Sequence, residues 1–241
     1  MKYVLVHGSW HQGELWEPVA GLLRNMGHEV HTPTIAGHGK NAARAGVSHA
    51  DCVRSIVDHI RANDLRGFVL VGHSFGGTII GRVAEELPDR ITRLVYWNAF
   101  VLQDGDSLND NVPPHLAQTF LDLAKQSPIG EVMLPFVVWR EVFMQDADLA
   151  LALRSYELLS PVPIRSFSDK VPMKTFYQLR IPKSYINCTE DNALGHGDWG
   201  WHPRMSSRLG MFRLIQMPGS HEVMFTNPTL LADKIVEAGR D

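Results

Sequence analysis

The sequence predicts an α/β protein with a mostly parallel sheet, helices on both faces and a helical cap. Short apolar runs typical of buried strands alternate with segments in which apolar residues recur at helical spacing. Up to about residue 100 the strands and helices alternate strictly, which favours parallel pairing of the strands. A long segment without this alternation follows, and the alternation then resumes.

The first part of the chain supplies strands that are short apolar runs and helices with one apolar face. Gly27 follows the first helix, where a glycine commonly ends the last turn. The strands are expected at residues 3–6, 29–32, 68–71 and 91–97, and the helices at residues 15–26, 49–62 and 78–87.

The alternation breaks near residue 103. The following segment is rich in proline, methionine and aromatic residues, and no clear strand is expected in it. It is too long for an ordinary connection, so we expect a cap inserted after the fourth strand, over the carboxyl edge of the sheet. Ligands bind at that edge in open α/β sheets. The helices of the cap are expected at residues 115–125, 135–144 and 146–159.

The sheet pattern resumes after the cap. Asn227-Pro228 opens the last helix, and proline is favoured in a first turn. The remaining strands are expected at 183–188 and 212–217, and the remaining helices at 203–210 and 228–238. We therefore expect a single domain over residues 1–241, with a core of about 1–103 and 177–241 and a cap of about 104–176.

Composition limits the classes of partner. The hydrophobic fraction of 44% and charged fraction of 20% are those of an ordinary globular protein. A net charge of −3 gives no reason to expect nucleic acid or an anionic membrane as partner. Cys52 and Cys188 are the only cysteines, too few for a disulfide framework, and the first apolar run is too short for a signal peptide. We expect a cytoplasmic protein.

A candidate nucleophile lies between the third strand and the third helix. The run Gly72-His73-Ser74-Phe75-Gly76 fits the pattern G-x-S-x-G. Such a turn exposes the serine hydroxyl, and its glycines let the strand and the helix approach closely. A glycine-rich turn with an incidental serine is the alternative, but the flanking strand and helix favour a nucleophile at Ser74.

A serine needs a base and an acid that orients the base. His221 follows the last strand at the same edge as Ser74 and is the candidate base. The acid is expected after the preceding strand, where Asp191 is our choice and Glu190 and Asp198 are alternatives. The chain order Ser, Asp, His is the one expected for this strand-turn-helix arrangement.

The oxyanion formed on attack needs two N–H donors. Phe75 directly follows the nucleophile, and we expect its backbone N–H to be one donor. The second is expected from the first loop, at the backbone N–H of Ser9. A plain turn between strand and helix, without this role, is the alternative.

Two other features could form a site: metal ligands in the segment 196–202, and the thiol of Cys188 as a nucleophile. His196, Asp198 and His202 have a spacing that fits no metal motif, so a solvated polar loop is expected there. Cys188 belongs to an apolar strand and is expected to be a small core residue. No phosphate loop or dinucleotide fingerprint follows the first strand. The sequence predicts neither a metal nor a cofactor.

With these motifs placed, the chain resembles the α/β-hydrolases, and within them the plant methyl-ester esterases, hydroxynitrile lyases and their bacterial esterase relatives. The resemblance covers nearly the whole chain. It is carried by Val4-Leu5-Val6-His7-Gly8, Trp16, Gly27-His28-Glu29-Val30, Val71-Gly72-His73-Ser74-Phe75-Gly76-Gly77, Asn98-Ala99-Phe100, Cys188-Thr189-Glu190-Asp191 and Gly219-Ser220-His221.

The resemblance implies the α/β-hydrolase fold, a helical cap and no cofactor. It places the nucleophile at Ser74, the acid at Asp191 rather than Glu190, the base at His221 and the oxyanion donors at Ser9 and Phe75. Two features depart from the family. The loop at residues 196–202 is longer than expected, and Glu222 stands where the lyases have a lysine.

These observations predict a serine carboxylesterase that cleaves an ester, or an activated amide or carbamate, of a small apolar or aromatic substrate through an acyl-enzyme. Trp10, His11 and Glu222 are expected to line the pocket. The cap is expected to contribute aromatic and methionine side chains, unless these only pack the cap: Met133, Phe136, Trp139, Phe143, Met144, Phe167 and Phe176. The alternatives are a lyase or cofactor-free oxygenase on the same fold, or a small-molecule receptor with residual hydrolase activity. A monomer or homodimer is expected.

Overall fold

A six-stranded parallel sheet forms the centre of the molecule in the computed structural model, which describes residues 1–240. The strand order is β2-β1-β3-β4-β7-β8, with every neighbouring pair parallel. This arrangement confirms the mostly parallel sheet predicted from the alternation of strands and helices. The strands are β1 (Lys2–Val6), β2 (Glu29–His31), β3 (Phe68–His73), β4 (Ile91–Trp97), β7 (Lys183–Cys188) and β8 (Arg213–Met217).

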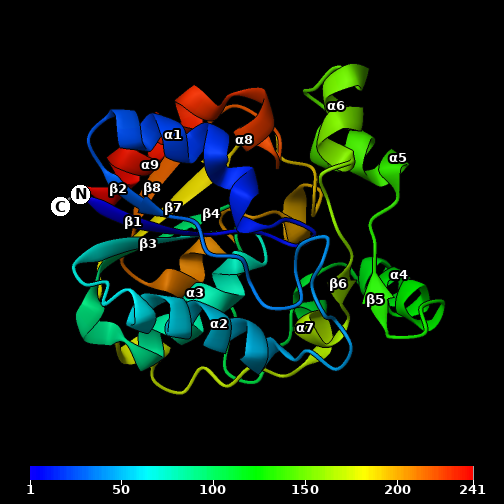
Figure 1. Ribbon diagram of the computed structural model, residues 1–241, viewed down its shortest axis with the longest axis horizontal. Helices are drawn as coiled ribbons and strands as arrows, with labels where there is room; N and C mark the ends of the chain where they lie inside the picture. Colours follow the sequence, from blue (N-terminus) through cyan, green and yellow to red (C-terminus); the bar gives the residue numbers. More distant parts are fainter. Residues whose placement is uncertain (241) are drawn as a thin grey trace.

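Helices cover both faces of this sheet (Figure 1). α1 and α9 pack together on one face, and α2 and α3 pack together on the other. A short helix, α8, lies near α1 and α9 and was not predicted. The bounds are α1 (Glu17–Asn25), α2 (His49–Ala62), α3 (Gly76–Glu86), α8 (Val223–Thr226) and α9 (Pro228–Gly239).

The segment between β4 and β7 lies beyond one edge of the sheet, in green at the right of Figure 1. Its helices are α4 (Pro114–Lys125), α5 (Phe136–Val138), α6 (Leu149–Tyr156) and α7 (Arg165–Ser168). The expectation of no strand here was wrong, because β5 (Glu131–Val132) and β6 (Val162–Pro163) form an antiparallel pair. Two-residue strands are too short to leave an apolar run in the sequence.

Two predicted helices take other forms. The helix expected at 135–144 begins as α5 and continues as a π-helix over Trp139–Phe143. The helix expected at 203–210 is a 3₁₀ turn over Ser206–Leu209. Gly210 ends that turn with a φ of 70°, a conformation that glycine adopts without steric cost.

Strand register brings the carboxyl ends of the strands to one edge. The pairings nearest that edge are Val6 with Gly72, His73 with Trp97, Trp97 with Ile186, and Cys188 with Met217. Residues that follow β1, β3, β7 and β8 in the chain therefore emerge beside one another. The loops that carry Ser9, Ser74, Asp191 and His221 begin at this edge.

The central strand β3 is buried along its whole length, as expected for a strand covered on both faces. Apolar side chains from both faces of the sheet pack against it in one continuous core. Within residues 1–240, no helix is long and apolar enough to cross a membrane.

We predict that two glycine-to-alanine changes in helices have opposite effects on stability. A Cβ at Gly77 in α3 would lie 2.3 Å from the carbonyl oxygen of Phe100, so Gly77→Ala forces the backbones apart. We expect a loss of about 1–3 kcal/mol in the free energy of unfolding. In α1, a Cβ at Gly21 would make an ordinary 3.5 Å contact with Glu17. Gly21→Ala should stabilise by about 0.5–1 kcal/mol. Urea unfolding of both variants measures the contrast, and a Gly77→Ala variant as stable as the natural protein would contradict it.

Candidate active site

Ser74 lies on the turn between β3 and α3 with a φ of 52°, a value that non-glycine residues rarely adopt. The turn is held from both sides. The N–H of Ser74 donates to the carbonyl of Trp97 at 3.3 Å, and the N–H of Phe100 donates to the carbonyl of Ser74 at 3.1 Å. Strained backbone of this kind persists only where the surroundings hold it, and it concentrates at functional sites.

The glycines around Ser74 are required by close backbone contacts. A Cβ at Gly76 would lie 2.6 Å from the carbonyl oxygen of Val6, and a Cβ at Gly72 would lie 2.8 Å from the carbonyl oxygen of Gly76. Any larger residue would push α3 away from β1 and β3. The spacing of the motif thus follows from the approach of the helix to the sheet.

His221 and Asp191 are paired. The Nδ1–H of His221 donates to Oδ2 of Asp191 at 2.6 Å, and both side chains are buried. The N–H of Ala193 donates to the other carboxylate oxygen at 2.8 Å. Asp191 therefore fixes the ring so that Nε2, the other nitrogen, is free to accept a proton.

Burial by itself would lower the pKa of His221, because it disfavours the charged imidazolium. The charge of Asp191, the hydrogen bond to it and the charge of Glu222 outweigh burial, and the pKa of His221 is raised above its ordinary value. The site therefore stabilises the protonated imidazole that a general base becomes after it takes a proton.

Asn98 is a further member of this group that sequence reasoning did not assign. Its Nδ2–H donates to Oδ2 of Asp191, and its Oδ1 accepts the N–H of Cys188 at 2.7 Å. Asn98 has a φ of 35°, which asparagine tolerates better than most residues. The signal available in the sequence was an asparagine directly after β4, at the same edge as the acid.

We expect Asn98→Gly to lower kcat/KM by about tenfold, because Asp191 loses a hydrogen bond to a charged group worth about 1.5–3 kcal/mol. Glycine adopts the positive φ freely, so this variant isolates the loss of the side chain. Asn98→Ala should lose a similar amount of activity and additional stability, because it keeps the strained φ. Steady-state kinetics and urea unfolding separate the two effects. A kcat/KM of Asn98→Gly equal to that of the natural protein would contradict the role of the hydrogen bond.

Three aromatic rings hold the imidazole of His221. Trp201 stacks on it with an interplanar angle of 12°, and Phe143 meets it edge-on at 86°. His73 lies 4.6 Å from it between ring centroids, and the Nε2–H of His73 donates to the carbonyl of His221 at 3.1 Å. His73 thus bonds to the loop of His221. Trp201 belongs to the long loop at 196–202, for which the sequence predicts only a solvated polar loop, and its contact with His221 is a role that this prediction missed.

The candidate nucleophile and the candidate oxyanion donors have no hydrogen-bond partner in the described part of the chain. The hydroxyl of Ser74 and the backbone N–H groups of Ser9 and Phe75 have no hydrogen-bond partner among residues 1–240. Ser74 and His221 line the same cavity without a hydrogen bond between them. Such bonds are often formed only when substrate binds.

The cavity at Ser74 is small and mostly apolar. Its volume is about 30 Å³, room for little more than a water molecule. It is lined by Ser9, Trp10, Ser74, Phe100, Leu108, Val112, Leu116, Phe120, Phe143, Phe167, Ala193, Leu194, Trp201 and His221. Its walls come from the loop after β1, the turn that carries Ser74, the segment between β4 and β7, and the loops after β7 and β8.

Comparison with known proteins identifies the family. Residues 3–234 match the alpha/beta hydrolase family. The chain belongs to this family. It is similar to the carbendazim hydrolyzing esterase of Nocardioides sp. (strain SG-4G), at 29% identity over 99% of both chains. It is also similar to salicylic acid-binding protein 2 of Nicotiana tabacum, at 25% identity over 98% of this chain and 95% of the relative.

A solved structure is similar over the full length of the chain. It is an extracellular alpha/beta-hydrolase from a Paenibacillus species, with a TM-score of 0.97, 41% identity and complete coverage of both chains. That hydrolase is described as sharing structural and functional homology with the tobacco salicylic acid-binding protein 2. The predicted likeness to plant methylesterases is confirmed, since methylesterase 2 of Arabidopsis thaliana is 26% identical over 97% of this chain. These esterase relatives support ester hydrolysis as the reaction class.

The predicted pocket of the hydrolase needs correction. Trp10, Phe143 and Phe167 line the cavity, but His11, Trp139 and Glu222 do not. The Nε1–H of Trp139 donates to Ser155 at 3.1 Å, so this indole is a buried part of the cap. His11 and Glu222 pair with each other, and neither is among the residues that line the cavity. Four further cap residues expected at the pocket lie outside its lining: Met133, Phe136, Met144 and Phe176.

The alternative acids and nucleophile of the hydrolase are placed unfavourably. Glu190 and Asp198 are exposed, and neither bonds to His221. Cys188 is buried, which raises the pKa of its thiol and keeps it protonated. Asp191 is the carboxylate that contacts the imidazole.

One group of side chains has the spacing of metal ligands. Ligand atoms of His73, His221 and Glu222 lie within 4.8 Å of one another. His221 is committed to Asp191 through Nδ1, and a carboxylate oxygen of Glu222 lies 3.0 Å from His11. A metal ion would have to compete with these partners.

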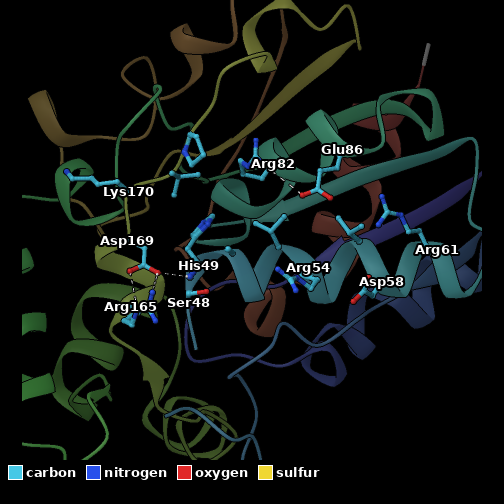
Figure 2. A pocket seen from close by; sticks show the side chains of 15 residues that line it. Ser48, His49, Arg54, Asp58, Arg61, Arg82, Glu86, Arg165, Asp169 and Lys170 are labelled. Carbon is cyan, nitrogen blue, oxygen red and sulfur yellow. Dashed lines mark hydrogen bonds and ion pairs between the residues drawn. The ribbon is translucent and has the colours of Figure 1, made fainter. Parts of the chain in front are cut away.

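A larger hollow of about 620 Å³ runs along α2 and contains none of the candidate catalytic residues (Figure 2). Its walls carry charges of both signs. Arg165 pairs with Asp169 at 3.3 Å, and Arg82 lies 4.0 Å from Glu86. Paired surface charges of this kind are typical of a solvated face. The candidate active site is therefore the smaller cavity at Ser74.

Proposed function

We propose that this hydrolase is a serine carboxylesterase that acts through an acyl-enzyme. The observation that carries the proposal is a shared cavity. Ser74, strained on its turn, and His221, bonded to the buried Asp191, line the same small apolar space. The similarity to named esterases supports the same reaction class.

The proposed reaction begins when the oxygen of Ser74 attacks the ester carbonyl carbon while Nε2 of His221 takes the hydroxyl proton. The N–H groups of Ser9 and Phe75 stabilise the negative charge that develops on the carbonyl oxygen. His221 then gives the proton to the leaving alcohol as the carbon–oxygen bond breaks. A water molecule attacks the acyl-enzyme with His221 again as base, and the acid and Ser74 are released.

The proposed substrate is a small ester with an apolar or aromatic acyl group, because most side chains around Ser74 are apolar. Pockets for small-molecule ligands usually measure about 300–1,000 Å³. A cavity of about 30 Å³ cannot hold such a substrate unless side chains of the cap move. The relatives named for hydrolysis of carbendazim or pyrethroids, and the methylesterases, support small esters as substrates.

A small-molecule receptor is the second candidate, and one observation favours it. A relative is named a salicylic acid-binding protein. A receptor would bind an aromatic acid and react at most once with an ester. Repeated turnover of a p-nitrophenyl ester supports the esterase, and a single burst without turnover supports the receptor.

We expect the natural protein to hydrolyse short or aromatic p-nitrophenyl esters and to give no useful cleavage of mandelonitrile. Cyanohydrin cleavage releases cyanide, and no lysine or arginine among the described residues lines the cavity to stabilise that anion. Parallel assays of ester hydrolysis and cyanide release test the expectation. Faster cleavage of mandelonitrile than of any ester would overturn the assignment in favour of a lyase. Oxygen consumption without ester turnover would instead favour the cofactor-free oxygenase.

The cytoplasmic location stays a prediction. Both cysteines are free and buried, but the similar Paenibacillus hydrolase is described as extracellular. Assay of cell and culture fractions for esterase activity decides between the two locations.

A further inference from the structure

His11 and Glu222 form a buried ion pair. Nε2 of His11 is 3.0 Å from a carboxylate oxygen of Glu222, and each side chain is almost completely buried. Neither residue lines the cavity at Ser74. The aromatic rings of Trp139 and Phe225 lie 5.8 and 6.0 Å from the His11 ring between centroids. The pair is therefore enclosed by side chains that exclude water.

The protonation state of His11 follows from the two groups that its ring nitrogens face. Nδ1 of His11 lies 2.6 Å from the carbonyl oxygen of Ser9, which can only accept, so Nδ1 carries a proton. Nε2 faces a carboxylate oxygen of Glu222 at 3.0 Å, within the distance of an ion pair. Burial disfavours the charged form of His11, but the charge and hydrogen bond of Glu222 outweigh burial and raise the pKa of His11. The imidazolium and the carboxylate then neutralise each other.

The pair connects the two loops that the reaction needs. His11 holds the carbonyl of Ser9, whose own N–H is the proposed oxyanion donor. Glu222 directly follows His221, and its N–H donates to the carbonyl of Phe143 at 3.3 Å. A continuous set of contacts thus connects the first loop, through His11 and Glu222, to the loop that carries His221.

Stability alone is a weak reason for such a pair. Removing two charges from water is costly, and apolar residues of similar volume often replace a buried ion pair without loss of stability. The ion pair at 3.0 Å and the contact of His11 with the Ser9 carbonyl at 2.6 Å, in contrast, tie the two loops together at defined distances. We propose that His11 and Glu222 are positioning residues that hold the Ser9 N–H and the His221 imidazole at a fixed separation across the cavity.

This role rests on the proposed esterase function, so hydrolysis by the natural protein is measured first. The variants are Glu222→Met, His11→Phe and the double variant with both changes. Each single change leaves an unpaired polar partner in the interior and should lower both the melting temperature and kcat. In the double variant, the melting temperature should recover, whereas kcat should stay at least about tenfold below that of the natural protein with KM within about twofold. Complete loss of an oxyanion donor costs about 10²–10³ in kcat, and a displaced donor costs part of that.

Two further variants keep the test decisive where the double variant does not fold. Glu222→Gln keeps the length of the side chain and an uncharged oxygen that can face His11. Glu222→Asp keeps the charge but moves it away from His11, because the side chain is one methylene shorter. Positioning predicts a higher kcat for Gln than for Asp, and an effect of charge alone predicts the reverse. The matched control is the exposed pair of Glu29 and His31, joined at 2.8 Å on β2. Glu29→Met with His31→Phe should change neither kcat nor KM.

The outcomes separate the two proposals. Absence of ester turnover in the natural protein overturns the esterase function and the positioning role with it. An active natural protein whose double variant has normal kcat, or whose Asp variant exceeds the Gln variant, overturns the positioning role alone. Recovery of melting temperature without recovery of kcat supports it.

Discussion

Ser74→Ala should lower ester hydrolysis by about three or more powers of ten, and a fluorophosphonate probe that labels the natural protein should no longer react. The change removes the attacking oxygen and nothing that holds the turn. The backbone bonds of Ser74 to Trp97 and Phe100 use main-chain atoms, and the hydroxyl bonds to no described residue. Alanine at position 74 also has to adopt the same positive φ as serine, so the backbone strain of the turn does not change. The variant should therefore stay folded with a melting temperature close to that of the natural protein.

The control for labelling is Ser207→Ala, because Ser207 is exposed and lies outside the cavity. This variant should react with the probe at the natural rate. Mass spectrometry of the labelled natural protein should place the adduct on the peptide that contains Ser74. An adduct elsewhere, or near-normal turnover by Ser74→Ala, would eliminate the serine mechanism.

The strands were predicted well because burial on both faces leaves a continuous apolar run in the sequence. The predicted bounds of β4 and β7 coincide with the observed Ile91–Trp97 and Lys183–Cys188. The loops at the carboxyl edge could be predicted for the same reason, since parallel register brings successive strand ends together. This places Ser74 and His221 at one edge without any knowledge of side-chain contacts.

The cavity could not be predicted in the same way. Whether a side chain of the cap faces the cavity depends on how the helices of the cap rotate against the sheet. Phe143 and Trp139 lie on the same π-helix, yet only Phe143 lines the cavity. Helical spacing indicates that both are buried but not what each one contacts.

The pairing of His11 with Glu222 could not be predicted from the sequence either. The two residues are far apart in the chain, and each was expected to face the substrate. A buried charged side chain needs a partner. Glu222 is buried together with its neighbours Ser220, His221 and Val223, and a glutamate at such a place could have indicated that a partner exists. The identity of the partner depends on the tertiary structure alone.

Asp191→Asn should lower kcat by about 10⁴ while the fold is retained, by analogy with known triads. The reason lies in the donors around the carboxylate. His221, Ala193 and Asn98 all donate to Asp191, so no position is left for an amide NH₂ group that donates in turn. If the NH₂ group faces His221, it holds the ring with Nδ1 as acceptor. The proton then lies on Nε2, and the ring can no longer accept the proton of Ser74.

The pH dependence gives this prediction a second measurement. Because Asp191 helps raise the pKa of His221 above its ordinary value of 6.5, the natural protein should lose kcat/KM on the acid side with a midpoint above 6.5. In Asp191→Asn the favourable charge is absent and burial remains, so the pKa of His221 falls and the acid limb of the residual activity moves to lower pH. Glu190→Gln and Asp198→Asn are the matched controls, since both carboxylates are exposed and make no bond to His221, and both variants should keep the natural profile. If Glu190→Gln or Asp198→Asn loses activity while Asp191→Asn stays active, the acid is not Asp191. Only the carboxylate that holds the imidazole can change both the rate and the pH midpoint of the acid limb.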